Sequence, residues 1–232
     1  MLAKSNFTGL YQLLDFDINS GYTFKRVIDL NVSIVQGSGI AACVSCGYLY
    51  FAELKNKSIY RLNLNTMSRD LGWHVNFADN IDDNDIITTY SACNLIVVSG
   101  GNAVYHFTRD GDMFDNLTMD IIVRSQSAIS LPTGEYVVAH DNIVSLFNIY
   151  GNRAIYSGLN LPKASSVLLN GGYLLIADPA NNRIALLSSY LSYIRDFVSS
   201  VPARHMWLDQ TRRLLYASTG ESQLVYVYSL RG

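Results

Sequence analysis

Short apolar runs that each end in a small or β-branched residue recur along the chain. Their ends stand at Ala52, Val98, Ala139, Ala177 and Ala217, so successive ends differ by 46, 41, 38 and 40 residues. A second apolar run starts about seven residues after each end, as in Ile184-Ala-Leu-Leu. Ala3 and Leu10-Tyr-Gln-Leu-Leu repeat this arrangement near the start of the chain. The spacing therefore predicts six copies of one unit.

Each full copy contains four strand-like segments. In the fifth copy they are expected at 165–169, 173–177, 183–188 and 192–198, with Asn170-Gly171-Gly172 as the turn between the first two. Asn-Gly and Gly-Gly between apolar runs indicate a hairpin, because such turns need positive φ angles. No segment has apolar residues at helical spacing over ten or more positions. The sequence therefore predicts an all-β protein.

One four-stranded unit of about 40 residues cannot bury both of its faces by itself, whereas neighbours in a ring can cover them. We therefore expect a six-bladed β-propeller of four-stranded antiparallel blades. It forms a single domain over 1–232, with repeats near 1–32, 33–73, 74–120, 121–160, 161–200 and 201–232. Two alternatives remain open: a five-bladed ring in which 22–30 completes the last blade, and a sandwich of strands without repeat symmetry.

Composition and charge narrow the function classes. Of 232 residues, 49% are hydrophobic and 16% charged, and the net charge is -2. This excludes a disordered chain and an overall electrostatic attraction to nucleic acid or anionic membrane. No apolar stretch is long enough for a membrane-spanning helix, and the first 20 residues carry Asp15 and Asp17 instead of a signal peptide. We expect a soluble, cytoplasmic protein, with secretion as the alternative.

The cysteines Cys43, Cys46 and Cys93 are an odd number and do not form a disulfide framework. The first two form a C-x-x-C motif, which is the spacing of half a zinc site or of a redox pair. A zinc site would need a second pair, and a thioredoxin-type motif would open a helix, whereas a strand follows Gly47. A structural role for the cysteines is favoured.

The segment Leu175-Ile-Ala-Asp-Pro-Ala-Asn-Asn-Arg-Ile184 resembles the NHL repeat, in which an apolar run, Ala-Asp, a short loop and Asn-Arg precede an apolar strand. Residues 125–230 are similar to the last half of the NHL propeller at the C-terminus of animal tripartite-motif proteins. The match is faint over 34–110 and rests on spacing alone over 1–33. This resemblance implies a propeller that binds protein or RNA.

The Asp178 and Arg183 pair of that motif has two interpretations. The pair is either a ligand clamp or a charge-assisted hydrogen bond that ties one blade's loop together. The structural tie is favoured, because Glu53, Ser99, His140 and Ser218 occupy the aspartate position in other copies.

Enzymatic chemistry finds little support in the motifs. Some NHL-type propellers, which this chain resembles, are metal-dependent lyases. Their histidines converge on a central channel from equivalent positions in different blades. The histidines here do not repeat: we expect His74 before a first strand, His106 in a third strand, His140 at the end of a second strand and His205 at the start of the last blade. No serine-hydrolase elbow or phosphate loop is present. The sequence thus predicts no enzyme, no metal and no cofactor.

The function class that remains is recognition of a ligand on one face of the ring. Turns between second and third strands, and the connections into first strands, share that face. The candidate ligand-binding residues expected there are Lys55, Lys57, Trp73, His74, Arg124, His140, Asn142, Lys163, Asn181, Arg183, Arg204 and His205. We expect a macromolecular ligand, protein first and RNA second, since a pI near 6.0 disfavours RNA.

A lectin-like, secreted propeller is the alternative from another class. The chain has 16 tyrosines, and repeated aromatic and amide sites would suit multivalent glycan binding. The tyrosines lie mostly within expected strands, however, where core packing explains them.

Overall fold

The fold is described from a computed structural model. It describes residues 2–4, 11–17, 23–29, 40–43, 46–53, 58–76, 86–90, 94–98, 103–119, 125–148, 150, 152–156, 159–161, 164–219 and 224–230.

These residues form six antiparallel sheets, each built from strands that follow one another in the chain. The four-stranded sheets in the middle of the chain are β4(Ile40–Cys43)–β5(Tyr48–Glu53)–β6(Ser58–Asn63)–β7(Ser68–Asn76), β8(Ile86–Tyr90)–β9(Asn94–Val98)–β10(Ala103–Phe107)–β11(Met113–Thr118), β12(Ser125–Ser130)–β13(Tyr136–His140)–β14(Ile143–Phe147)–β15(Arg153–Tyr156) and β16(Ser166–Asn170)–β17(Tyr173–Asp178)–β18(Arg183–Ser188)–β19(Tyr193–Ser199). The sheets at the two ends are β1(Leu2–Lys4)–β2(Tyr11–Asp17)–β3(Thr23–Asp29) and β20(His205–Asp209)–β21(Leu214–Ser218)–β22(Val225–Ser229).

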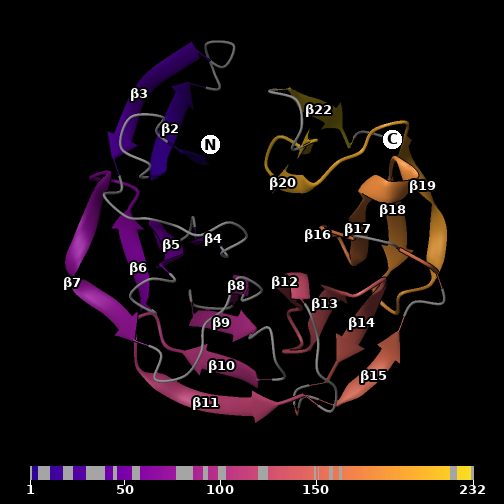
Figure 1. The fold of residues 1–232 in the computed structure, drawn as a ribbon, viewed down its shortest axis with the longest axis horizontal. Helices are drawn as coiled ribbons and strands as arrows, with labels where there is room; N and C mark the ends of the chain where they lie inside the picture. Colours follow the sequence, from indigo (N-terminus) through magenta and orange to yellow (C-terminus); the bar gives the residue numbers. More distant parts are fainter. Residues whose placement is uncertain are drawn as a thin grey trace.

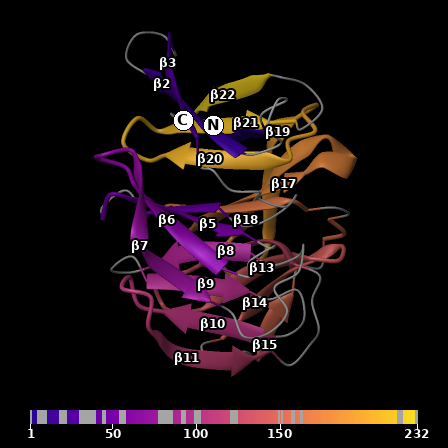
Figure 2. The same cartoon turned by 60° about the vertical axis from the view of Figure 1, so that its left-hand side comes forward.

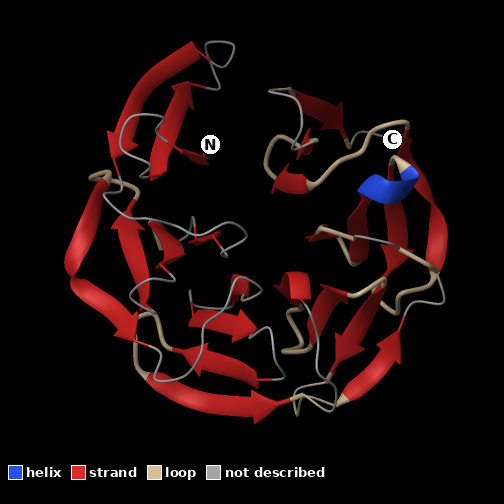
Figure 3. Ribbon diagram, viewed as in Figure 1, coloured by secondary structure: helices blue, strands red, loops and turns tan. Residues whose placement is uncertain are grey.

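The six sheets stand around a central axis like blades, with the first strand of each full blade nearest the axis and the fourth at the rim (Figure 1). Figure 2 shows the same sheets from the side. From the second blade to the sixth, the first strands of neighbouring blades contact one another. The described chain is almost entirely strand, and its short 3-10 helix lies at Pro179–Asn181 (Figure 3). Within the described residues, no helix has both the length and the apolar character needed to span a bilayer. The six-bladed all-β propeller expected from the repeat is confirmed.

The second strands of the fourth and fifth blades, β13 and β17, bury both of their faces, one against each neighbouring blade. In β13, Tyr136 and Val138 pack with the third blade, whereas Val137 and Ala139 pack with the fifth. In β17, Ile176 packs with the fourth blade, and its neighbours in sequence turn to the sixth. Side chains alternate between the two faces of a strand, so a nearly continuous apolar run is what such a strand requires.

The two end sheets settle the number of blades. β3 pairs with β2 along Asp29 to Thr23, in the sheet that opens the chain. This strand therefore does not complete the last blade, and the five-bladed alternative, in which 22–30 was expected to do so, is wrong. In the described residues, β20, β21 and β22 correspond to the first three strands of a full blade.

The fifth blade matches the prediction most closely, with each strand boundary within one residue of the expected position. Gly171 and Gly172 form the turn between β16 and β17 with φ angles of 55° and 86°. At these angles a Cβ is disfavoured, which explains why two glycines stand there. The predicted boundary at residue 73 differs, because β7 continues to Asn76.

Polar contacts also join neighbouring blades. The guanidinium of Arg61 in β6 binds Asp70 of its own blade at 2.7 Å and donates from Nη1 to the carbonyl of Arg109 in the third blade at 2.8 Å. His106 and Tyr136 join the third and fourth blades through a buried hydrogen bond of 2.6 Å between Nε2 and the hydroxyl. Desolvation lowers the pKa of His106, against a smaller opposing effect of Asp115.

Replacing Ile176 by aspartate tests the two-sided burial. Ile176→Asp places an unpaired charge between two blades, and we expect the free energy of unfolding to fall by about 4 kcal/mol or more. Chemical denaturation followed by circular dichroism measures this. Tyr173→Asp is the control, since that side chain starts the same strand and is half exposed. Equal stability of the two variants would contradict the assignment of β17.

The burial of His106 between the third and fourth blades predicts a pH dependence of stability. Desolvation lowers the pKa of His106 in the folded protein below the ordinary 6.5, so the folded state binds the proton less readily than the unfolded chain does. The unfolded chain takes up the proton as the pH falls through 6.5, so the free energy of unfolding should decrease below that pH, by at most about 1.4 kcal/mol per pH unit. Denaturation at several pH values between 5 and 8 measures the slope. His106→Gln should reduce it, and an unchanged slope would exclude His106 as its source.

Candidate functional site

The propeller has two ends that differ in their connections. We call the end with the turns between second and third strands, and with the connections between blades, the loop end. We call the other end, with the first-to-second and third-to-fourth strand turns, the turn end. Antiparallel blades alternate their strand direction, so each type of connection recurs at the same end in every blade.

The loop end was expected to hold the ligand-binding residues. Lys55, Lys57, Arg124 and Lys163 lie outside the described residues. Asn142 lies exposed in the turn between β13 and β14, and Asn181 lies exposed in the 3-10 helix between β17 and β18. Arg204 and His205 lie at the entry to β20. The described positions of these four residues agree with the expected end, and their role in binding stays a prediction.

Trp73 and His74 were placed wrongly, because both lie within β7, the rim strand of the second blade, and not in a connection before the third blade. Trp73 is only 6% exposed and packs with Tyr50 at a ring-centroid distance of 5.4 Å. The Arg61 guanidinium lies 5.0 Å from its ring centroid. Trp73 is therefore part of the core between the second and third blades and not part of an exposed ligand face.

His140 was expected to face a ligand, and it is buried instead. Its Nε2 lies 2.8 Å from Oγ of Ser145, and its Nδ1 lies 3.1 Å from Oδ2 of Asp141. This sequence of contacts matches that of a Ser-His-Asp triad. Ser145, however, is 0% exposed in the middle of β14. The contacts thus satisfy buried polar groups and do not present a nucleophile to a substrate.

Asp178 and Arg183 form the tie expected from the sequence. Oδ2 of Asp178 accepts hydrogen bonds from Nε of Arg183 at 2.9 Å and from Nδ2 of Asn181 at 2.8 Å. Arg183 also reaches Asp196 in β19, 3.3 Å away. Burial opposes the charge of the guanidinium, but the hydrogen bond and charge of Asp178 outweigh it and raise the pKa of Arg183. The Arg183 side chain therefore holds the loop between β17 and β18.

The turn end carries exposed aromatic side chains that the sequence reasoning missed. Tyr150 is 69% exposed in the turn between β14 and β15, and Tyr190 is 71% exposed in the corresponding turn of the next blade. Tyr173 follows the glycine turn of that blade and is 50% exposed. It pairs with Ser188, two residues before Tyr190. Within the described chain, none of these three hydroxyls has a hydrogen-bond partner.

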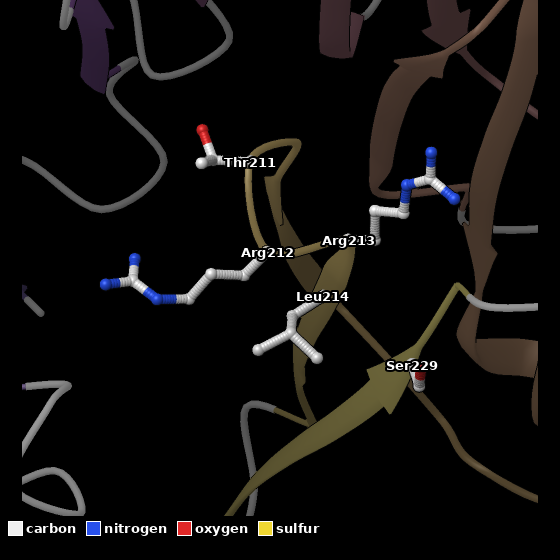
Figure 4. Close-up of a pocket in the computed structure, with 5 residues that line it drawn as sticks. All are labelled: Thr211, Arg212, Arg213, Leu214 and Ser229. Carbon is white, nitrogen blue, oxygen red and sulfur yellow. The ribbon is translucent and has the colours of Figure 1, made fainter.

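An open hollow of about 700 Å³ lies at the same end in the sixth blade. Its lining residues are Thr211, Arg212, Arg213, Leu214 and Ser229 (Figure 4). The two guanidinium groups extend away from each other. Arg212 binds Asp209 at 2.9 Å, and the hydrogen bond from its backbone N–H lowers the pKa of that carboxyl. The diverging arginines do not form a clamp for a single anion.

The titratable groups do not assemble a reaction centre in the described chain. No three His, Cys, Asp or Glu residues gather there to hold a metal ion. The histidines lie in four different strand positions: His74 in a fourth strand, His106 in a third, His140 in a second and His205 in a first. Partial desolvation and the neighbouring Arg204 lower the pKa of His205.

Comparison with known proteins supports the fold. A protein of unknown function from Bacteroides caccae superposes with a TM-score of 0.67 over 96% of this chain and 83% of that chain, at 12% identity. The chain is folded like a propeller. A catalytically inactive virginiamycin B lyase from Staphylococcus aureus, with quinupristin, superposes with a TM-score of 0.58 over 85% of this chain and 72% of that chain, also at 12% identity. No family model and no curated protein matches the sequence.

Removing Arg183 tests whether the tie is structural. Arg183→Ala leaves the fully buried carboxylate of Asp178 without its cation, and we expect the free energy of unfolding to fall by about 3 kcal/mol. Arg195→Ala, on the exposed neighbouring strand β19, should change it by less than about 0.5 kcal/mol. Urea denaturation compares the two. A small effect in both variants would mean that the tie contributes nothing to stability.

Proposed function

We propose that this chain is a non-enzymatic recognition module that binds another protein at its turn end. The observation that carries the proposal is the group of exposed tyrosines Tyr150, Tyr173 and Tyr190 on the fourth and fifth blades. Tyrosine is enriched at protein interfaces, because it brings a large rigid ring and a hydroxyl at a small entropic cost. Large exposed side chains of this kind on neighbouring blades are typical of an interaction surface.

The charge balance favours a protein partner over RNA. RNA binding needs cationic side chains along a groove for the phosphates, together with aromatic rings for stacking. The chain has 17 Lys and Arg against 19 Asp and Glu. Arg109, Arg212 and Arg213 are exposed at the same end. Arg109 lies 3.7 Å from Asp110, and Arg212 binds Asp209 at 2.9 Å, so neighbouring carboxylates balance two of these charges. Such a surface, with uncharged tyrosines, suits a polypeptide better than a polyanion. A glycan remains the alternative ligand, since tyrosine rings also stack on sugars.

Two further points favour binding over catalysis. The resemblance of residues 175–184 to the NHL repeat links the chain to propellers that recognise macromolecules, and we propose that it is of this type. The Staphylococcus aureus neighbour is a lyase, but the four histidines here stand in four different strand positions. A ring of converging ligands needs equivalent positions, so we propose that the chain has no such activity. The cytoplasmic location stays a prediction.

Site-specific photocrosslinking tests this function. Benzoylphenylalanine at position 190 should crosslink a protein when the chain is illuminated in an extract of its own cells. The same group at position 142, on the loop end, is the matched control because Asn142 is also exposed in a turn. Mass spectrometry identifies the product, and its affinity for the purified chain is then measured. Tyr173→Ala/Tyr190→Ala should weaken that binding at least about tenfold, as expected for an interface centre.

The outcomes separate the alternatives. Crosslinking at position 142 but not at 190 would place the interface at the loop end predicted from the sequence. A ligand digested by ribonuclease, whose affinity falls steeply with salt, would contradict the protein proposal in favour of RNA. Binding that free sugar reverses would favour the glycan alternative.

A further inference from the structure

Cys43 and Cys46 are joined by a disulfide, although the odd number of cysteines pointed away from one. Both residues are disulfide-bonded, and the chain has one other cysteine, so they can be bonded only to each other. Cys43 ends β4, and Cys46 precedes Gly47 in the turn to β5. The disulfide thus lies in a strand turn at the turn end of the second blade.

This disulfide contributes little to holding the hairpin together. The ladder between β4 and β5 already pairs Ile40 with Phe51 and Cys43 with Tyr48. The carbonyl of Gly47 also accepts a hydrogen bond of 2.8 Å from the backbone of Leu64. The stabilisation that a disulfide provides grows with the length of the loop it closes, and this loop is nearly as short as possible. A role in thiol chemistry therefore explains this disulfide better than stabilisation of the hairpin does.

The two sulfurs differ in access. Cys43 is buried in the cluster that contains Tyr50 and Trp73, whereas Cys46 is partly exposed at the edge of that cluster. An incoming thiolate can therefore reach Cys46 first and displace Cys43. The guanidinium of Arg61 lies 4.3 Å from the ring centroid of Tyr48, the strand partner of Cys43. This cation is itself paired with Asp70 at 2.7 Å, so the difference between the two sulfurs rests on the partial exposure of Cys46.

We propose that Cys43 and Cys46 form a reversible thiol–disulfide exchange site whose substrates are small thiols such as glutathione. A thiolate attacks the sulfur of Cys46, the bond to Cys43 breaks, and Cys43 leaves as a thiolate. A second thiolate then attacks the outer sulfur of the mixed disulfide, which releases Cys46 and the oxidised small thiol. Two electrons pass from the two small thiols to the protein pair, and the two protein thiolates take up the protons.

The redox state of this site changes the packing between two blades. Two separate thiols need more space than a bonded pair, and Cys43 packs in one cluster with Trp73 of its own blade and Phe107 of the third blade. A disulfide also quenches a nearby indole. Trp73 therefore serves as an internal reporter, since the chain has only one other tryptophan, Trp207.

The experiment uses the whole chain with Trp207→Phe and Cys93→Ser, so that one indole and one cysteine pair remain. The protein is equilibrated with mixtures of reduced and oxidised glutathione, free thiols are alkylated, and mass spectrometry counts the modified cysteines. We expect the folded protein to be reduced at a rate within about tenfold of that of the denatured protein, since access controls the exchange. Trp73 emission should rise on reduction, fall on reoxidation, and remain unchanged in the Cys46→Ser variant.

Three results would overturn the proposal. Reduction that occurs only after denaturation would make the bond a structural crosslink. Two free thiols under oxidising glutathione would mean that no disulfide forms. Loss of the folded circular dichroism spectrum on reduction would make the bond a requirement for folding. Native-state reduction that is reversible, with retained structure and a Trp73 response, supports the exchange site.

Discussion

The burial of both faces of the second strands β13 and β17 is the constraint on which this structure depends. A strand such as β13 carries five consecutive buried side chains, and no single sheet can remove both faces of such a strand from water. Neighbouring blades must supply the cover, and each blade in turn needs its own neighbour. The apolar clusters accordingly lie between blades, as in the cluster that joins the fourth and fifth blades around Val137 and Ile176. The ring thus forms because each sheet has apolar faces that only a neighbouring sheet can cover.

The same constraint explains the polar groups that resemble functional sites. Wherever a polar side chain enters a tightly packed blade, it needs a partner inside the protein, because an unpaired buried group is costly. The contacts of His140 with Ser145, of His106 with Tyr136 and of Asp178 with Arg183 all meet this need. Their geometry is similar to that of catalytic groups. Because they are buried, however, they stabilise the fold and do not act on a substrate.

Where both faces of an inner strand are covered, as in β13 and β17, the ends of the propeller are left to carry function. The described loop end presents polar side chains such as Asn142 and Asn181, whereas the turn end presents aromatic rings in two adjacent blades. The disulfide also lies at the turn end, but in the second blade, whereas the exposed tyrosines lie in the fourth and fifth blades. A recognition surface and a redox-sensitive turn can therefore coexist on one end without sharing residues.

The repeat in the sequence was sufficient to predict the blades, because the period of the apolar runs directly reflects the need for mutual cover. The hairpin of Gly171 and Gly172, the strands of the fifth blade and the tie at Asp178 followed from local rules of the same kind. Which side chains reach solvent depended on tertiary packing. Trp73 belongs to a strand that extends beyond its expected boundary, and only the neighbouring blade buries it. Tyr190 is exposed for the opposite reason, since it stands in a turn beyond the reach of any neighbouring blade.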